Sequence, residues 1–352
     1  MVSRADRFRG SILAGAVGDA LGYDIEFHEI EGIRAAHGPD GLRGYVNPDR
    51  GLISDDTQMT LFTLEGLIRA HAGGRDVVQV LQHAYQRWLH TQGRPWEQTG
   101  GRFATAAEPD GWLVGNRELH DRRAPGSTCL KALRAFATDG VQGTLTHALN
   151  NSKGCGGVMR VAPCALWPGD AGEVFRLAAQ AAALTHSHPS GYLSAGALAV
   201  IVQALLGGAD LPRAVGAARL ELIRWDGYEE QFAALDAAIA LAKRGRPTPE
   251  AIAAELGGGW VGEEALAIAV CAALAADDLA DGLLLAVNHS GDSDSTGAIC
   301  GNILGALHGP GAIPAQWLAA LELRDVIDTL AVDALAEFGP EPPDWQGRYP
   351  GW

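Results

Sequence analysis

Two short acidic segments are the parts of the sequence best suited to do chemistry. Each holds two carboxylates and neighbouring hydroxyls, and a helical pattern begins at or directly after it. The segments are Ser54-Asp55-Asp56-Thr57 and residues 291–297, which contain Asp292, Asp294 and Ser295. Neither contains a His or Cys, and oxygen ligands of this kind suit Mg²⁺ or Mn²⁺ better than zinc.

The two segments lie far apart in the chain, near its two ends. Four carboxylates packed together would repel one another, and their pKa values would be forced apart unless cations were bound between them. We therefore expect the segments to meet in space and to hold one or two divalent cations.

Composition excludes several classes of protein. The chain has 352 residues, is 47% apolar and carries a net charge of −15, which argues against nucleic-acid binding or anionic-membrane binding through a basic surface. Its five cysteines are scattered, without a C-x-x-C pair, as is typical of a reduced intracellular protein. Residues 191–206 are too short for a comfortable membrane span. We expect a cytoplasmic monomer.

Helical periodicity dominates the chain, and almost no alternating strand pattern is present. We predict an all-α fold with a single compact domain over residues 1–352. The first helix, from Arg4 to about Leu21, is crowded with glycine and alanine, which indicates close approach of another helix or a ligand. Residues 32–53 are predicted to be a long loop. The tail, residues 337–352, is expected either to lie on the body or to be loose.

Two glycine-containing segments are candidate phosphate sites. Gly154, Gly156 and Gly157 could leave backbone N–H groups exposed for a pyrophosphate, although neither a Walker loop nor a dinucleotide fingerprint is present. A helix is predicted to begin after residues 125–128, and its N-terminus could take a phosphate. An ordinary N-cap is the commoner explanation of that second pattern.

Two other polar residues have open roles. His186 lies just before Pro189, which is predicted to end any helix there, and no partners for a zinc site are evident. We interpret His186 as a hydrogen-bonding or stacking residue. Asp19, near the end of the first helix, is either satisfied by local backbone donors or functional, because a buried carboxylate needs partners in both cases.

Four motifs in this order resemble those of the ADP-ribosylglycohydrolase family: residues 15–22, 54–57, 154–160 and 288–297. The resemblance spans most of the chain. It implies an all-α fold with a binuclear Mg²⁺ or Mn²⁺ centre, and cleavage of the bond between the distal ribose of ADP-ribose and an acceptor. The acceptor would be a protein side chain, such as arginine or serine, or a small compound. A nucleic acid is expected only as an ADP-ribosylated substrate.

The resemblance also assigns roles to individual residues. The implied metal ligands are Ser54, Asp55, Asp56, Asp292, Asp294 and Ser295, with serine at two positions where the family commonly has threonine. The implied substrate-binding residues are Ser152, Gly154, Gly156, Gly157 and His186. Glu26 falls where some members have a catalytic or gating glutamate. Lys153 and Cys155 lie at positions that vary across the family, which leaves the acceptor open.

The expected chemistry fits these residue types. Breaking a ribosyl C1–N or C1–O bond develops positive charge at C1, which carboxylates stabilise. We expect Asp55 or Asp56 to act as general base, with Glu26 assisting. Two alternatives remain open. One is a two-metal phosphohydrolase that cuts the pyrophosphate, and the other is a non-enzymatic protein that binds ADP-ribose or a partner.

Overall fold

The computed structural model describes residues 2–345 and 347–350, which contain helices and isolated bridges but no β-strand. The prediction of an all-α fold is therefore confirmed. The described residues form sixteen α-helices, which pack into one large apolar core and a small separate cluster of Trp96, Phe103 and Phe136. They are α1 (Arg4–Gly22), α2 (Ile30–His37), α3 (Asp55–Ala72), α4 (Val77–Thr91), α5 (Trp96–Thr99), α6 (Ser127–Asp139), α7 (Ala171–Ala183), α8 (Pro189–Leu206), α9 (Leu211–Leu222), α10 (Glu229–Ala242), α11 (Pro249–Leu256), α12 (Gly262–Ala275), α13 (Leu279–Val287), α14 (Ser293–His308), α15 (Ala315–Ala320) and α16 (Arg324–Glu337).

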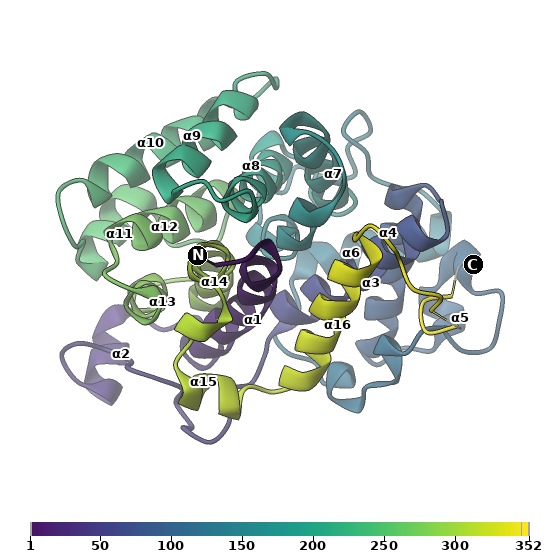
Figure 1. The fold of residues 1–352 in the computed structure, drawn as a ribbon, viewed down its shortest axis with the longest axis horizontal. Helices are drawn as coiled ribbons and strands as arrows, with labels where there is room; N and C mark the ends of the chain where they lie inside the picture. The colour runs from purple at the N-terminus through teal and green to yellow at the C-terminus, as the bar shows by residue number, and fades with distance from the viewer. Residues whose placement is uncertain (1, 346, 351–352) are drawn as a thin grey trace.

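Helices α1 and α14 form the central pair of the fold (Figure 1). A Cβ atom on Gly18 would lie 2.0 Å from the carbonyl oxygen of Gly297, so the two backbones touch where a side chain would not fit. The end of α1 lies against the start of α14, since a Cβ on Gly22 would lie 2.2 Å from the oxygen of Ser293. The small residues of the first helix thus admit another helix, and they join the two ends of the sequence.

Two groups of helices flank this pair. Helices α9 to α12 lie on one side in Figure 1, and α3 to α6 lie on the other, where α16 packs along α3 and α1. Helix α8 is, among the described residues, the one helix long and apolar enough to cross a membrane. Within this protein, 78% of its residues are buried, so it forms part of the core.

Two local predictions were wrong. Residues 32–53 were expected to be a loop, yet α2 occupies Ile30–His37 and buries Ile30 and Ile33. A helix of two turns is too short to show periodicity. Pro189 was expected to end a helix, but it begins α8, because the first position of a helix needs no N–H donor.

The C-terminal tail lies on the body in its described part. The indole Nε1 of Trp345 donates to Glu337 at 2.7 Å, and the hydroxyl of Tyr349 donates to Asp333 at 2.6 Å. The guanidinium of Arg348 lies 4.6 Å from the ring centre of Trp112. Of the two sequence-based alternatives for the tail, the structure shows the packed one.

Candidate metal centre

The first acidic segment is fixed by the start of α3 and by Asp19 of α1. Ser54 caps the helix, and its Oγ accepts from the backbone N–H of Asp56 at 3.2 Å. The Asp19 carboxylate accepts from the N–H groups of Ser54 and Thr57, each at 3.0 Å, and from the Thr57 hydroxyl. Asp19 is therefore a positioning residue that ties the acidic segment to the central helix pair.

The second acidic segment begins α14. Asp292 caps this helix and accepts from the N–H of Ser295 at 3.3 Å, while Asp294 Oδ1 accepts from the same N–H at 2.9 Å. The backbone N–H of Asp292 donates to the carbonyl of Gly258 at 2.8 Å. Gly291 has φ +144°, and a Cβ there would lie 2.0 Å from the Gly258 oxygen. Only glycine fits this contact between the two turns.

The two segments open onto one cavity of about 350 Å³, as expected. Carboxylate oxygens of Glu26, Asp292 and Asp294 lie within 4.8 Å of one another, which is close enough to share a metal ion. None of the described residues that line the cavity is a lysine or arginine. Its acidic lining consists of Glu26, Asp55, Asp56, Asp292 and Asp294.

Burial without counter-charge perturbs these carboxyl groups. Burial, reinforced by the charge of Asp294, raises the pKa of Asp56 well above its usual range. Burial also raises the pKa of Asp292, again with a contribution from Asp294. For Glu26, burial and then the charges of Asp294 and Asp292 raise the pKa to about 10. The ionised cluster is therefore unstable without a cation.

The donor set fits a hard divalent cation. Asp56 is 2% exposed, and its Oδ1 has no hydrogen-bond partner among the described residues. Buried polar atoms are nearly always satisfied, so this oxygen requires an explanation. An oxygen-rich group of carboxylates with serine hydroxyls beside it is the ligand type that Mg²⁺ and Mn²⁺ prefer.

The glycine-rich turn differs in part from the expectation of free backbone donors. The N–H of Gly154 donates to Ser152 Oγ at 3.2 Å, and the N–H of Cys155 donates to the carbonyl of Trp260 at 3.2 Å. These two amides already have partners and are not available for a pyrophosphate. For Gly154 the expectation was wrong, because it assumed that a glycine-rich turn leaves its amides unpaired.

Not all the predicted substrate-binding residues face the cavity in the same way. Gly154, Gly156 and His186 line it. Gly157 packs instead against α8, where a Cβ would lie 2.7 Å from the Gly191 oxygen. The Ser152 hydroxyl lies 3.2 Å from the Thr128 hydroxyl beside the cavity. The substrate-binding roles of all five residues stay predictions.

His186 is a buried, neutral side chain. Its Nδ1 lies 2.8 Å from the Thr185 hydroxyl, which agrees with the predicted hydrogen-bonding role. Burial, with help from the Arg160 charge, lowers its pKa to about 3. The neutral ring borders the cavity next to Gly154 and Gly156.

The N-terminus of α6 meets the metal centre. The N–H of Gly126 donates to Asp55 Oδ2 at 3.1 Å, so this helix end binds a carboxylate of the protein itself.

Two contacts at the site were not predicted from sequence. The thiol of Cys155 donates a hydrogen bond to Asp292 Oδ2, with 2.8 Å between sulfur and oxygen, and Phe27 stacks on Trp260 at the cavity. Phe27 follows Glu26 and Cys155 follows Gly154 in the sequence, but no local pattern indicated either contact.

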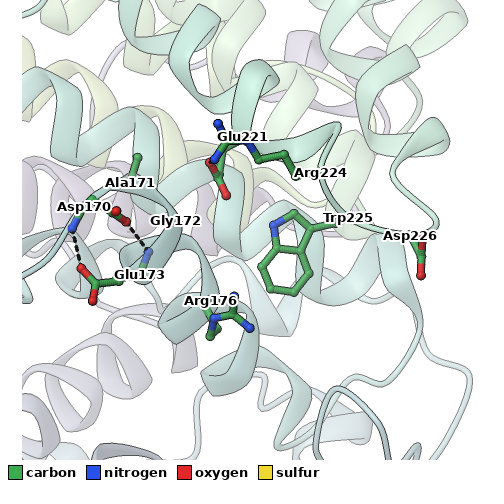
Figure 2. A pocket seen from close by; sticks show the side chains of 9 residues that line it. All are labelled: Asp170, Ala171, Gly172, Glu173, Arg176, Glu221, Arg224, Trp225 and Asp226. Atoms are coloured by element: carbon green, nitrogen blue, oxygen red, sulfur yellow. Dashed lines mark hydrogen bonds and ion pairs between the residues drawn. The ribbon is translucent and has the colours of Figure 1, made fainter.

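A second, larger cavity of about 760 Å³ lies between α7 and the end of α9 (Figure 2). Asp170 and Glu173 form the capping box of α7, and Arg224 pairs with Glu221 at 3.1 Å. Asp226, which also lines this cavity, is exposed to solvent. This cavity therefore lacks a group of buried carboxylates like that of the candidate metal centre.

Comparison with known proteins decides the family. A sequence model of the ADP-ribosylglycohydrolases matches residues 1–343. The chain belongs to the ADP-ribosylglycohydrolase family. One relative, ADP-ribosyl-[dinitrogen reductase] glycohydrolase of Rhodospirillum rubrum, is 26% identical over 91% of each chain.

Other members of the ADP-ribosylglycohydrolase family agree along nearly the whole chain. ADP-ribosylarginine hydrolase Tri1 of Serratia proteamaculans is 24% identical, covering 96% of this chain and 80% of the relative. A solved structure of an ADP-ribosylglycohydrolase-related protein complex matches with a TM-score of 0.67 and 26% identity. The match covers 96% of this chain and 100% of that one. Both the fold and the suspected family are thereby confirmed.

Proposed function

We propose that this protein is a monomeric, cytoplasmic hydrolase that cleaves the ribosyl C1 bond of ADP-ribosylated substrates and releases ADP-ribose. The observation that carries the proposal is the group of buried carboxylates, contributed by both ends of the chain and facing one cavity without a counter-charge. Membership of the family and the names of two relatives support the same chemistry. An ADP-ribosylated protein, modified on arginine or another side chain, is the proposed substrate.

The proposed cofactors are two Mg²⁺ or Mn²⁺ ions. When bound, divalent cations supply Lewis-acid polarisation of a water and orientation of sugar hydroxyls. The chain would hold them with residues from α3 and α14. These proposed ligands are Ser54, Asp55, Asp56, Asp292, Asp294 and Ser295.

The proposed general base is Asp55 or Asp56. Both carboxyls are buried at the cavity wall, and a carboxylate there can take a proton from the attacking water. Glu26 borders the same space and assists, because its oxygen lies within 4.8 Å of those of Asp292 and Asp294. Negative charge around the reacting carbon stabilises the positive character that develops at C1.

Product analysis tests this function against its alternatives. The protein is incubated with an ADP-ribosylated protein and Mg²⁺, and the released nucleotide is identified by chromatography. We expect free ADP-ribose, lost on adding EDTA or in Asp292→Ala. Asp328→Ala, which removes a surface ion pair with Arg9, is the matched control and should keep activity.

Other products would contradict the proposal in a recognisable way. AMP with ribose 5-phosphate would identify a phosphohydrolase that cuts the pyrophosphate. Tight binding that persists in EDTA, without turnover of any ADP-ribosylated substrate, would identify a binding protein.

A further inference from the structure

Two aromatic side chains that the proposed chemistry does not use stand at the metal centre. Phe27 directly follows Glu26, and Trp260 directly follows the turn that contacts Asp292. Their ring centres are 5.1 Å apart, with 23° between the ring planes, so the rings stack. Both side chains line the same cavity as the carboxylates.

The backbone holds Phe27 in a costly conformation. Its φ is +68°, in the left-handed region, which costs a residue other than glycine on the order of 1 kcal/mol. Hydrogen bonds on either side fix the turn, from Glu26 N–H to Gly22 O at 2.9 Å and from His28 N–H to Ile25 O at 3.1 Å. The ring is nevertheless 67% exposed, so the strain does not serve burial in the core.

Trp260 is held from the opposite side of the cavity. Its carbonyl accepts from the N–H of Cys155 at 3.2 Å, and the N–H groups of Gly258 and Gly259 both donate to Glu264 at 3.1 Å. The indole itself is 42% exposed. The pair is thus a fixed aromatic surface beside the acidic cluster. Trp260 covers one face of the Phe27 ring, and much of Phe27 is open to solvent.

The chemistry of this place favours a flat cation. An aromatic face attracts a guanidinium by a cation–π interaction, and a planar guanidinium also stacks on rings. A neutral acceptor, such as a serine side chain, gains from neither effect.

We propose that Phe27 and Trp260 form the acceptor platform of the enzyme and select substrates whose ADP-ribose is attached to a guanidinium group. This inference deepens the proposed function and rests on it. The two aromatic rings act on the leaving group and determine which linkage is preferred.

The test compares two defined substrates, a peptide ADP-ribosylated on arginine and one ADP-ribosylated on serine. Phe27→Leu and Trp260→Leu remove the π face but keep an apolar side chain. We expect the ratio of kcat/KM for the arginine peptide over the serine peptide to fall by roughly threefold to thirtyfold, mainly through a higher KM. Phe27→Tyr and Trp260→Phe, which keep a ring, should restore most of the ratio.

A binding measurement without catalysis separates this inference from the proposed function. Agmatine carries a guanidinium without ADP-ribose, and its binding is followed by ligand-observed NMR. The wild type should bind it more tightly than Phe27→Leu or Trp260→Leu, whereas Leu220→Ala, an equally exposed apolar residue on α9, should behave as wild type. If the wild type hydrolyses neither peptide but agmatine binding still depends on the rings, the proposed function fails and the platform stands.

Two outcomes would overturn the platform. One is normal hydrolysis with an unchanged ratio in both leucine variants. The other is agmatine binding that is equal in the wild type and both leucine variants. An equal loss of kcat on both peptides would show that the rings only support the metal centre, which also contradicts the inference.

Discussion

Helix α3 carries two buried acidic regions that are built differently. At its start, Asp55 and Asp56 face a cavity with no lysine or arginine among the described residues that line it. On its body, Glu65 is fully buried, but its Oε2 accepts from the Arg87 guanidinium at 2.6 Å. Arg69, also on α3, pairs with Asp110 at 2.9 Å.

The difference separates a structural use of buried charge from a functional one. Where the chain supplies its own counter-charge, the acidic group stabilises the packing of α3 against α4. Where it supplies none, the buried negative charge requires a cation from outside. An unpartnered buried oxygen does not separate the two regions, because Glu65 Oε1 and Asp56 Oδ1 both lack a hydrogen-bond partner among the described residues, so the counter-charge is what separates them. Buried charges are otherwise paired or bind metals. Glu65 is as deeply buried as Asp55 and Asp56, so burial alone does not distinguish these carboxyl groups.

The largest expected effect is on activity. Asp56→Asn should lower the rate of ADP-ribose release by roughly 100- to 10,000-fold, because it removes a proposed metal ligand and base. In the metal-free protein the same change should not lower the free energy of unfolding, since it removes an uncompensated charge. Parallel kinetics and urea denaturation measure both. If Asp56→Asn keeps full activity, the functional role assigned to the start of α3 is wrong.

Glu65→Gln should lower the stability of the protein and leave its activity nearly unchanged, the reverse of Asp56→Asn. The change leaves Arg87 buried without its closest counter-charge, and the free energy of unfolding should fall by about 3 kcal/mol. The kcat of the folded fraction should stay near that of the wild type. The double change Glu65→Gln with Arg87→Met should recover much of the loss in urea denaturation. A Glu65 variant as stable as the wild type would show that the ion pair contributes little.

Metal binding should stabilise the folded protein only through the carboxylates at the start of α3, and not through Glu65. At a Mg²⁺ concentration about 100 times its Kd, the free energy of unfolding should rise by about 2.7 kcal/mol. Thermal unfolding with and without EDTA measures this in three proteins. The wild type and Glu65→Gln should both gain stability, and Asp56→Asn should gain much less. Equal gains in all three would place the ion elsewhere.

The smallest expected effect is the change in the free energy of unfolding per pH unit in the metal-free protein. Burial, and then the charge of Asp294, raises the pKa of Asp19 from 3.8 to about 7. Between these values the unfolded state is ionised while the folded state keeps its proton. The stability contributed by this group is therefore fully present below about pH 4 and is lost as pH rises through about 7. The loss is at most about 1.4 kcal/mol per pH unit.

Urea denaturation in EDTA across this pH range measures the slope. Asp19→Asn should reduce the slope without abolishing it, because Asp56 and Asp292 also have raised pKa values. Glu65→Gln should leave the slope unchanged. A wild-type protein that becomes more stable as pH rises through this range would contradict the assigned direction of the pKa shift.

Several parts of the site were predictable from local sequence. The hydroxyl and carboxylates at residues 54–56 have the composition of a helix N-cap, and the structure places them there. The helical periodicity predicted the long helices, because one buried face repeats over several turns. It missed α2, whose buried face consists of only Ile30 and Ile33.

Other parts depended on contacts between distant residues. The amides of Gly154 and Cys155 looked free in the sequence, but a hydroxyl and a carbonyl elsewhere accept from them. The stack of Phe27 on Trp260 joins residues that no spacing relates. Neither feature has a local signature, since each depends on where a second segment lies.

The types of ligand, the helical fold class and the family motifs were thus set by residue chemistry and short-range periodicity. The arrangement of the proposed ligands around one cavity was set by packing. Gly18 and Gly297 let α1 and α14 touch, and that contact brings the start of α14 beside the start of α3. Residue type and spacing act within a few turns of helix, whereas the distance between carboxylates of opposite chain ends exists only once the helices have packed.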